Sequence, residues 1–148
     1  MDSQKLQDIA YDYLMNAQIA KERDGFLAPL IVIVNDTDEI RTQSIILESD
    51  EDVEALEELL HKLSEISQAL MLINDAYILD IPDDEKHLAD FSIHPDARQY
   101  IHCFIYTKEN TFSRRMPYTN TDGNYLFHDL GWDKIVGNLG NYQNPFFK

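Results

Sequence analysis

The stretch ALMLINDAYIL at residues 69–79 decides the fold of this chain. It either extends a helix that is expected before it or forms a central strand. Periodicity alone does not separate these two structures in a short apolar segment. The β-branched and aromatic residues Ile73, Tyr77 and Ile78, followed by Pro82, favour a strand. We therefore predict a strand at 69–79 and keep the longer helix as the alternative.

Two amphipathic helices are predicted before this strand. Residues 3–23 and 50–67 both carry apolar side chains at helical spacing. Ser49 or Asp50 can cap the second helix, and Asp52 stands near the position that completes a capping box.

Segments rich in β-branched and aromatic residues, bounded by turn residues, predict the other strands. These are 26–34 and 40–47, which form a hairpin, 98–107 and 111–118, which form a second hairpin, and a short strand at 125–128. From about residue 130 the chain combines glycines with aromatic residues. We expect this tail to be irregular, with one helical turn near 133–136, and to be pinned by its aromatic side chains.

These elements predict an α+β fold in a single domain, residues 1–148. The expected order of the main elements is α-β-β-α-β-β-β, which leaves out the short segment 125–128. Antiparallel hairpins with two helices fit a two-layer sandwich, in which an antiparallel sheet carries both main helices on one face.

The charge balance restricts what the surface can bind. Twenty-seven Asp and Glu residues oppose twelve Lys and Arg residues, for a formal net charge of -15. Such a surface repels phosphate backbones and anionic membranes, so we expect no direct nucleic-acid binding and no membrane binding. It favours a basic protein surface as partner. The sequence does not define the oligomeric state.

The sequence also bears on the compartment. Cys103 is the only cysteine, so no intrachain disulfide can form and nothing points to an oxidising compartment. The start Met1-Asp2-Ser3-Gln4 is polar and lacks the features of a signal peptide. We expect a cytoplasmic location.

A dense run of acidic residues opens the second helix. Six acids lie between Asp50 and Glu58, which at the helical rise is one charge per roughly 2 Å. Duplex DNA carries one charge per about 1.7 Å. Mimicry of DNA is therefore a hypothesis, although acids at a helix N-terminus are also favoured by the helix dipole alone. The expected partner contacts are Glu51, Glu54, Glu57, Glu58, Asp83, Asp84 and Glu85.

The sequence gives less support to a metal site or to nucleophilic catalysis. The loop with Asp83, Asp84, Glu85 and His87 offers oxygen ligands but lacks the pattern of a calcium loop, and we interpret it as a solvated acidic loop. His102 and Cys103 are adjacent on a predicted strand, so their side chains point to opposite faces. We therefore expect no catalytic residues, no metal and no cofactor.

One face of the 98–107 strand is the alternative site. Arg98, Tyr100 and His102 share this face with two more aromatic residues, and we expect the helices to cover the other face. The face is either an exposed ligand surface or is covered by the aromatic tail, and tail cover is favoured. Asp75 on the preceding strand is placed to pair with Arg98 across the sheet. A small enzyme or ligand-binding protein would use Asp75, Arg98, Tyr100 and His102.

The segments Ala69-Leu70-Met71-Leu72-Ile73-Asn74-Asp75-Ala76-Tyr77 and His94-Pro95-Asp96-Ala97-Arg98-Gln99 resemble a family of small bacterial and phage α+β proteins. The chain departs from the pattern at Asp75 and Tyr77, where Glu and Trp are expected. The resemblance implies this fold and an origin on a mobile element, and it brings no established activity.

We therefore expect a non-enzymatic, acidic protein-binding module. In its concrete form it is a phage or mobile-element inhibitor that occupies the basic nucleic-acid-binding surface of a host defence protein. The alternative is the small enzyme or ligand-binding protein described above.

Overall fold

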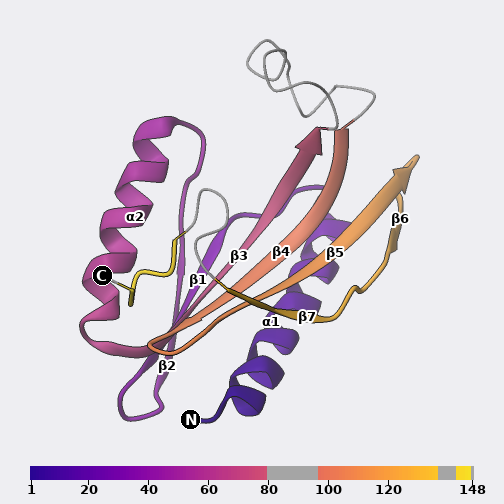
Figure 1. The fold of residues 1–148 in the computed structure, drawn as a ribbon. Coiled ribbons are helices and arrows are strands. Elements are labelled where there is room, and N and C mark those ends of the chain that lie inside the picture. The colour runs from indigo at the N-terminus through magenta and orange to yellow at the C-terminus, as the bar shows by residue number, and fades with distance from the viewer. Residues whose placement is uncertain (80–96, 137–142, 148) are drawn as a thin grey trace.

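The computed structural model describes residues 1–79, 97–136 and 143–147, and confirms the predicted α+β class and order of elements (Figure 1). In chain order the elements are α1 (Ser3–Asp24), β1 (Leu30–Asn35), β2 (Ile40–Ser44), α2 (Asp50–Ser64), β3 (Ser67–Leu79), β4 (Ala97–Thr107), β5 (Thr111–Thr121), β6 (Asn124–Phe127) and β7 (Trp132–Ile135). The strands form one antiparallel sheet in the order β2-β1-β3-β4-β5-β6. β7 pairs with the first part of β5, and β6 pairs with its last part.

The stretch 69–79 is strand, as predicted, and lies at the centre of the sheet. β3 pairs with β1 on one side and with β4 on the other. Residues 69–73 are buried on both faces, which explains why this stretch is continuously apolar rather than alternating. β3 also runs past β1, because their last pair is Leu30 with Ile73. In the described chain, Asn74 and the residues after it have a sheet neighbour only in β4.

Local sequence signals set the ends of both helices. α1 is capped by the Asp2 side chain and ends at Gly25, whose φ of 77° is a left-handed conformation that glycine adopts without strain. α2 begins with a capping box, in which the side chains of Ser49 and Asp52 each accept a hydrogen bond from the other residue's backbone N–H. α2 ends before the predicted residue 67, because β3 starts there.

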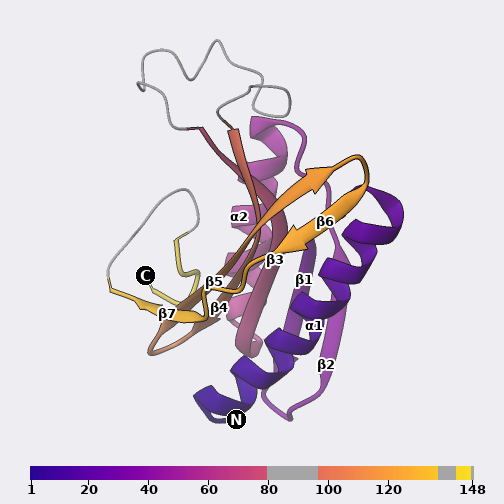
Figure 2. The same ribbon diagram turned by 90° about the vertical axis from the view of Figure 1, so that its right-hand side faces the viewer.

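The two helices lie on opposite faces of the sheet, so the prediction that both cover one face was wrong (Figure 1, Figure 2). The α1 core joins Leu6, Ala10 and Leu14 to Val32, Val34, Met71, Ile101 and Cys103. The α2 core joins Leu56 and Leu60 to Ile31, Leu70, Leu72, Phe104 and Tyr106. The central strands are apolar on both faces, so each face needs its own helix to exclude water. The result is three layers instead of two.

The segment Trp132–Ile135 is strand β7, so the helical turn predicted near 133–136 was also wrong. Trp132 lies opposite Arg114 in the ladder with β5. The Arg114 guanidinium lies 4.6 Å from the ring centroid of Tyr11 and 5.3 Å from that of Trp132, and it is ion-paired with Asp129. These contacts between distant parts of the chain favour the extended conformation over a local helical turn.

A buried asparagine holds the end of the described chain. Asn144 is 4% exposed, and its amide nitrogen donates to the carbonyl oxygens of Thr107 and Asn110 and to the hydroxyl of Thr111. Phe146 follows it and packs against the α2 core. Among the described residues of the tail, Phe146 therefore packs at the Phe104 and Tyr106 end of this face of β4, while Tyr100 and His102 line a cavity.

Candidate functional site: a cavity on the α2 face of the sheet

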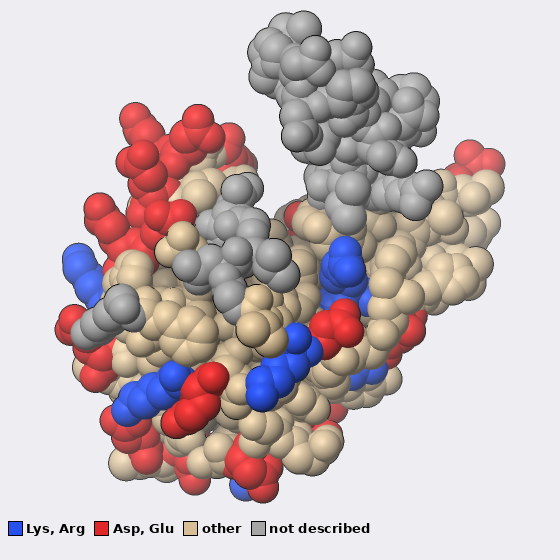
Figure 3. Space-filling model, in the orientation of Figure 1, with Lys and Arg blue, Asp and Glu red and all other residues tan. Residues whose placement is uncertain are grey.

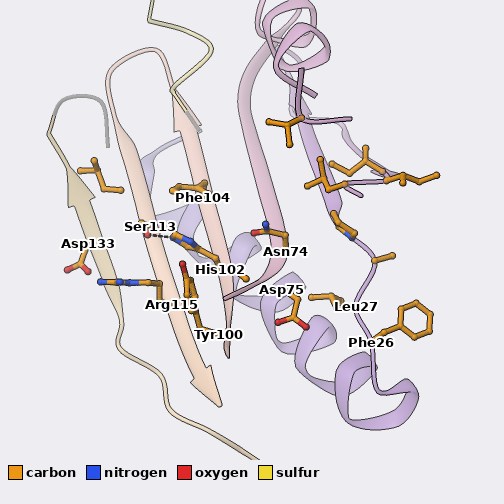
Figure 4. Close-up of a pocket in the computed structure, with 18 of the residues that line it drawn as sticks. Phe26, Leu27, Asn74, Asp75, Tyr100, His102, Phe104, Ser113, Arg115 and Asp133 are labelled. Carbon is orange, nitrogen blue, oxygen red and sulfur yellow. Dashed lines mark hydrogen bonds between the residues drawn. The ribbon is translucent and has the colours of Figure 1, made fainter. Parts of the chain in front are cut away.

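A cavity of about 1300 Å³ opens on the α2 face of the sheet (Figure 4). Residues of β3, β4 and β5 line its floor. One wall is formed by residues 26–29 and 45–48 together with Val53 of α2, and the other wall is formed by residues 133–136. Ligand pockets are commonly about 300–1,000 Å³, so this cavity can hold a sizeable small molecule.

A row of three polar residues crosses the floor. Asn74 of β3 lies opposite His102 of β4, and His102 lies opposite Arg115 of β5. Residues directly opposite each other in antiparallel strands share a face, so all three side chains belong to the cavity side. We call Asn74, His102 and Arg115 the polar row. It is bordered by Phe104 and Ser113, which are the next opposed pair on β4 and β5.

Asn74 carries an unsatisfied side-chain oxygen at the edge of the cavity. The residue is 7% exposed, and its side-chain oxygen has no hydrogen-bond partner among the described residues. Leaving a buried polar atom unpaired costs about 1–3 kcal/mol. Native proteins rarely retain such an atom without a reason, and a ligand that hydrogen-bonds the amide is one such reason.

His102 is neutral and hydrogen-bonded. Its Nε2 lies 2.6 Å from the hydroxyl oxygen of Ser113 (Figure 4). Burial, and to a smaller extent the nearby Arg115 charge, lowers the pKa of His102 to about 4. Burial raises the pKa of Tyr100, while Arg115 acts in the opposite direction. The floor of the cavity therefore includes one cation, Arg115, which lies opposite His102.

These contacts suit binding better than catalysis. Ser113 and His102 have the spacing of a nucleophile and its general base. An imidazole with a pKa of about 4 is, however, a weak base near neutral pH. Ser113 also lies within a paired strand and is only 6% exposed, which leaves little room for attack on a substrate. Cys103 points to the α1 core, as expected, and burial raises the pKa of its thiol.

The structure separates the residues of the alternative site. Tyr100 and His102 line the cavity, as their shared face predicts. Asp75 borders it where β3 passes β1, but its carboxylate pairs with Lys21 at 2.8 Å and accepts hydrogen bonds from the Tyr118 hydroxyl on the α1 side. Arg98 is described by its backbone, which lies opposite Ile78, while Asp75 lies opposite Ile101. The register therefore does not place Asp75 opposite Arg98.

Three residues of the cavity floor were not predicted from the sequence, namely Asn74, Ser113 and Arg115. The alternation of β5 was the available signal, because Ser113 and Arg115 lie on one face of that strand. To place Ser113 and Arg115 beside His102, the register between β4 and β5 was also needed.

The predicted acidic contacts fall into two groups. Glu51, Glu54, Glu57 and Glu58 are exposed on α2, away from the buried side of that helix, and the space-filling view shows acids gathered over it (Figure 3). Asp83, Asp84 and Glu85 lie outside the described residues, as does His87 of the loop considered for a metal.

Within the described ranges, no three His, Cys, Asp or Glu side chains are grouped so that they could hold a metal ion. Neither helix of the described chain combines the length and the apolar character needed to cross a bilayer. Comparison with known proteins finds no matching family model, no matching curated protein and no matching solved structure.

Proposed function

We propose that this protein is a binding protein whose ligand occupies the cavity on the α2 face. The observation that carries the proposal is the polar row of Asn74, His102 and Arg115 on the floor of an otherwise largely apolar cavity. A few convergent polar groups among apolar walls are the usual composition of a ligand site. The polar row fixes the orientation of the ligand, and the walls contribute apolar contact.

The unpaired side-chain oxygen of Asn74 supports a binding role for the cavity. A leucine at this position would have similar volume and would remove the unpaired oxygen, so the described contacts give no reason for asparagine. A residue that weakens the fold and faces a cavity is typical of a site where stability is given up for function.

An NMR screen tests the proposal. A library of small molecules is added to the ¹⁵N-labelled protein, and we expect some members to shift the amide signals of His102, Ser113 and Arg115. Asn74→Leu should weaken the binding of these compounds while the free energy of unfolding is unchanged or higher. Gln43→Leu, an exposed site on β2, is the control and should leave binding unchanged. If no compound shifts these signals, the cavity is not a ligand site.

A second candidate is the acidic binding module, which the exposure of Glu51, Glu54, Glu57 and Glu58 on α2 favours. We propose that this helix face contacts a basic surface of a nucleic-acid-handling protein. In the form that we expect from the sequence, the protein is a phage or mobile-element inhibitor that mimics DNA. Attraction between opposite charges would speed the encounter, and added salt would weaken it.

A pull-down from a bacterial lysate with mass spectrometry tests this candidate. Glu54, Glu57 and Glu58 are changed together to Lys, and captured proteins should be lost from this variant and from the wild type at high salt. The matched control changes Asp12, Glu22 and Glu109 to Lys, which are exposed acids away from α2. Capture that is equal in both variants would reject binding through α2.

We further propose that binding takes place in the cytoplasm. The only cysteine, Cys103, is a buried free thiol, so the fold uses no disulfide. That composition is usual for proteins of reducing compartments.

A further inference from the structure

The cavity floor is positive in a protein whose net charge is -15. Arg115 has no ion-pair partner among the described residues. Two described acids lie near the floor: Asp75 is ion-paired with Lys21 at 2.8 Å, and Asp133 of β7 lies opposite Ser113. The pKa values of Tyr100 and His102 both respond to Arg115, and no acid contributes to either shift. An anionic group at the polar row would therefore meet the Arg115 guanidinium, which forms no ion pair within the described residues.

The charged residues of the walls sum to a net charge of -1, and all of them are exposed. Glu48 and Asp133 are exposed acids on the two walls, Lys134 is an exposed base beside Asp133, and all three have access to solvent. Water and salt screen exposed charges of this kind. Arg115 is exposed as well, so the preference for an anion at the polar row rests on the position of Arg115 beside His102 and not on weaker screening.

The mouth of the cavity is apolar. Phe26 is 66% exposed, Ile46 is 67% exposed and Val136 is 86% exposed, and all three belong to the cavity lining. Apolar side chains gathered around an opening are typical of a surface that a ligand covers. The polarity therefore runs from a polar, positive floor to an apolar mouth.

From this gradient we infer that the ligand is a free amphipathic anion, which places a small anionic head such as a carboxylate at the polar row and an apolar body toward the mouth. The inference rests on the proposed cavity function and names its ligand class. The polar row spans three strands, which is about 10 Å at the usual strand spacing. Phe104 and Val53 border the path of the apolar body, and Phe26, Ile46 and Val136 meet its far end.

Three probes with the same chain and different heads test the ligand class. Decanoate, decanol and decyltrimethylammonium are titrated below their aggregation limits, and binding is followed by the amide signals of His102, Ser113 and Arg115. We expect decanoate to bind at least about tenfold more tightly than the other two, because charge-assisted hydrogen bonds to Arg115 are available only to the anion.

Matched variants test which residues contact the anionic head of the ligand and which contact its apolar body. Arg115→Gln should weaken decanoate about tenfold and leave decanol unchanged, whereas Arg41→Gln on the edge strand β2 should leave both unchanged. Phe26→Ser should weaken all three probes. Ile19→Ser is its control, because Ile19 is 58% exposed on α1 and is not part of the cavity lining.

Co-sedimentation with vesicles of phosphatidylglycerol tests whether the protein binds anionic lipids in a bilayer instead of a free amphiphile. We expect no co-sedimentation, since a protein of net charge -15 is repelled by an anionic surface. Co-sedimentation would overturn the free ligand in favour of a lipid surface.

Two other outcomes would overturn the inference. If decanol or the ammonium probe binds as tightly as decanoate at these signals, the anionic class is wrong while the cavity remains a ligand site. If none of the three probes shifts these signals, the amphipathic class is wrong, and the small-molecule screen decides separately whether the cavity binds anything.

Discussion

Lys21 and Asp75 form a buried ion pair that ties the last turn of α1 to β3. Nζ of Lys21 lies 2.8 Å from Oδ2 of Asp75, and their side chains are 8% and 11% exposed. The Tyr118 hydroxyl donates to both carboxylate oxygens, and the Lys21 ammonium lies 5.5 Å from the centroid of the Tyr118 ring. This cluster lies on the α1 side of β3, close to the residue that opens the polar row.

Removal of one partner of this pair should destabilise the fold strongly. Lys21→Met leaves the Asp75 carboxylate buried without its counter-ion, and we expect a loss of about 3–5 kcal/mol in the free energy of unfolding. The double variant Lys21→Met with Asp75→Leu removes both charges and should be clearly more stable than the single variant. Urea denaturation measures both. A double variant no more stable than the single one would show that the pair is not effectively buried.

Truncation of the α2 core should be costly. Leu60 is 3% exposed and packs against the sheet, so Leu60→Ala should cost about 2–5 kcal/mol. Ile66→Ala is the control, because Ile66 is 65% exposed and should change stability little. Equilibrium denaturation of both variants provides the comparison. Equal effects would mean that α2 does not bury its apolar stripe.

His102 should make stability depend on pH. Its pKa is lowered to about 4 in the folded state, whereas an unfolded histidine titrates near about 6.5. Between these values only the unfolded chain binds the proton, so stability falls as pH drops from about 6.5 to about 4, by on the order of 3 kcal/mol. His102→Gln should remove this part of the pH dependence. Urea denaturation at pH 7 and pH 5 checks it, and an unchanged difference between the two pH values would contradict it.

Asn144 should control the attachment of the tail. Its amide nitrogen serves three acceptors, so Asn144→Asp replaces the donor with a carboxylate that cannot donate to any of them. We expect faster hydrogen exchange at Phe146 and loss of its packing against the α2 core. Asn124→Asp, at an exposed position at the start of β6, is the control. Unchanged exchange at Phe146 would show that other contacts hold the tail.

The sequence predicted elements better than faces. Helical spacing identified α1 and α2, and the β-branched residues of 69–79 identified β3. The side of the sheet that each helix covers was not predictable, because Leu70 and Met71 are both apolar and point to opposite faces. β7 was missed because Trp132 is held by Arg114 and Tyr11, which are distant in sequence.

The polar row was missed because it depends on register. The structure pairs Tyr106 with Thr111, so that His102 lies opposite Arg115. A three-residue loop at 108–110 would instead pair Thr107 with Thr111, and this slip of one residue would put Met116 opposite His102. A slip of one residue turns every side chain to the other face. Local sequence does not fix such a choice between hairpin loops.

The burial of β3 on both faces also has a consequence for synthesis of the chain. Residues 69–73 form an uncharged apolar run, which in an unpaired state is suited to stacking with copies of itself. Its partner β4 follows only after residues 80–96, so the nascent segment waits for that pairing. Repulsion between chains of net charge -15 opposes self-association during this interval. The acidic surface then helps to keep the chain soluble while β3 is unpaired, and this protection weakens as salt screens the charge.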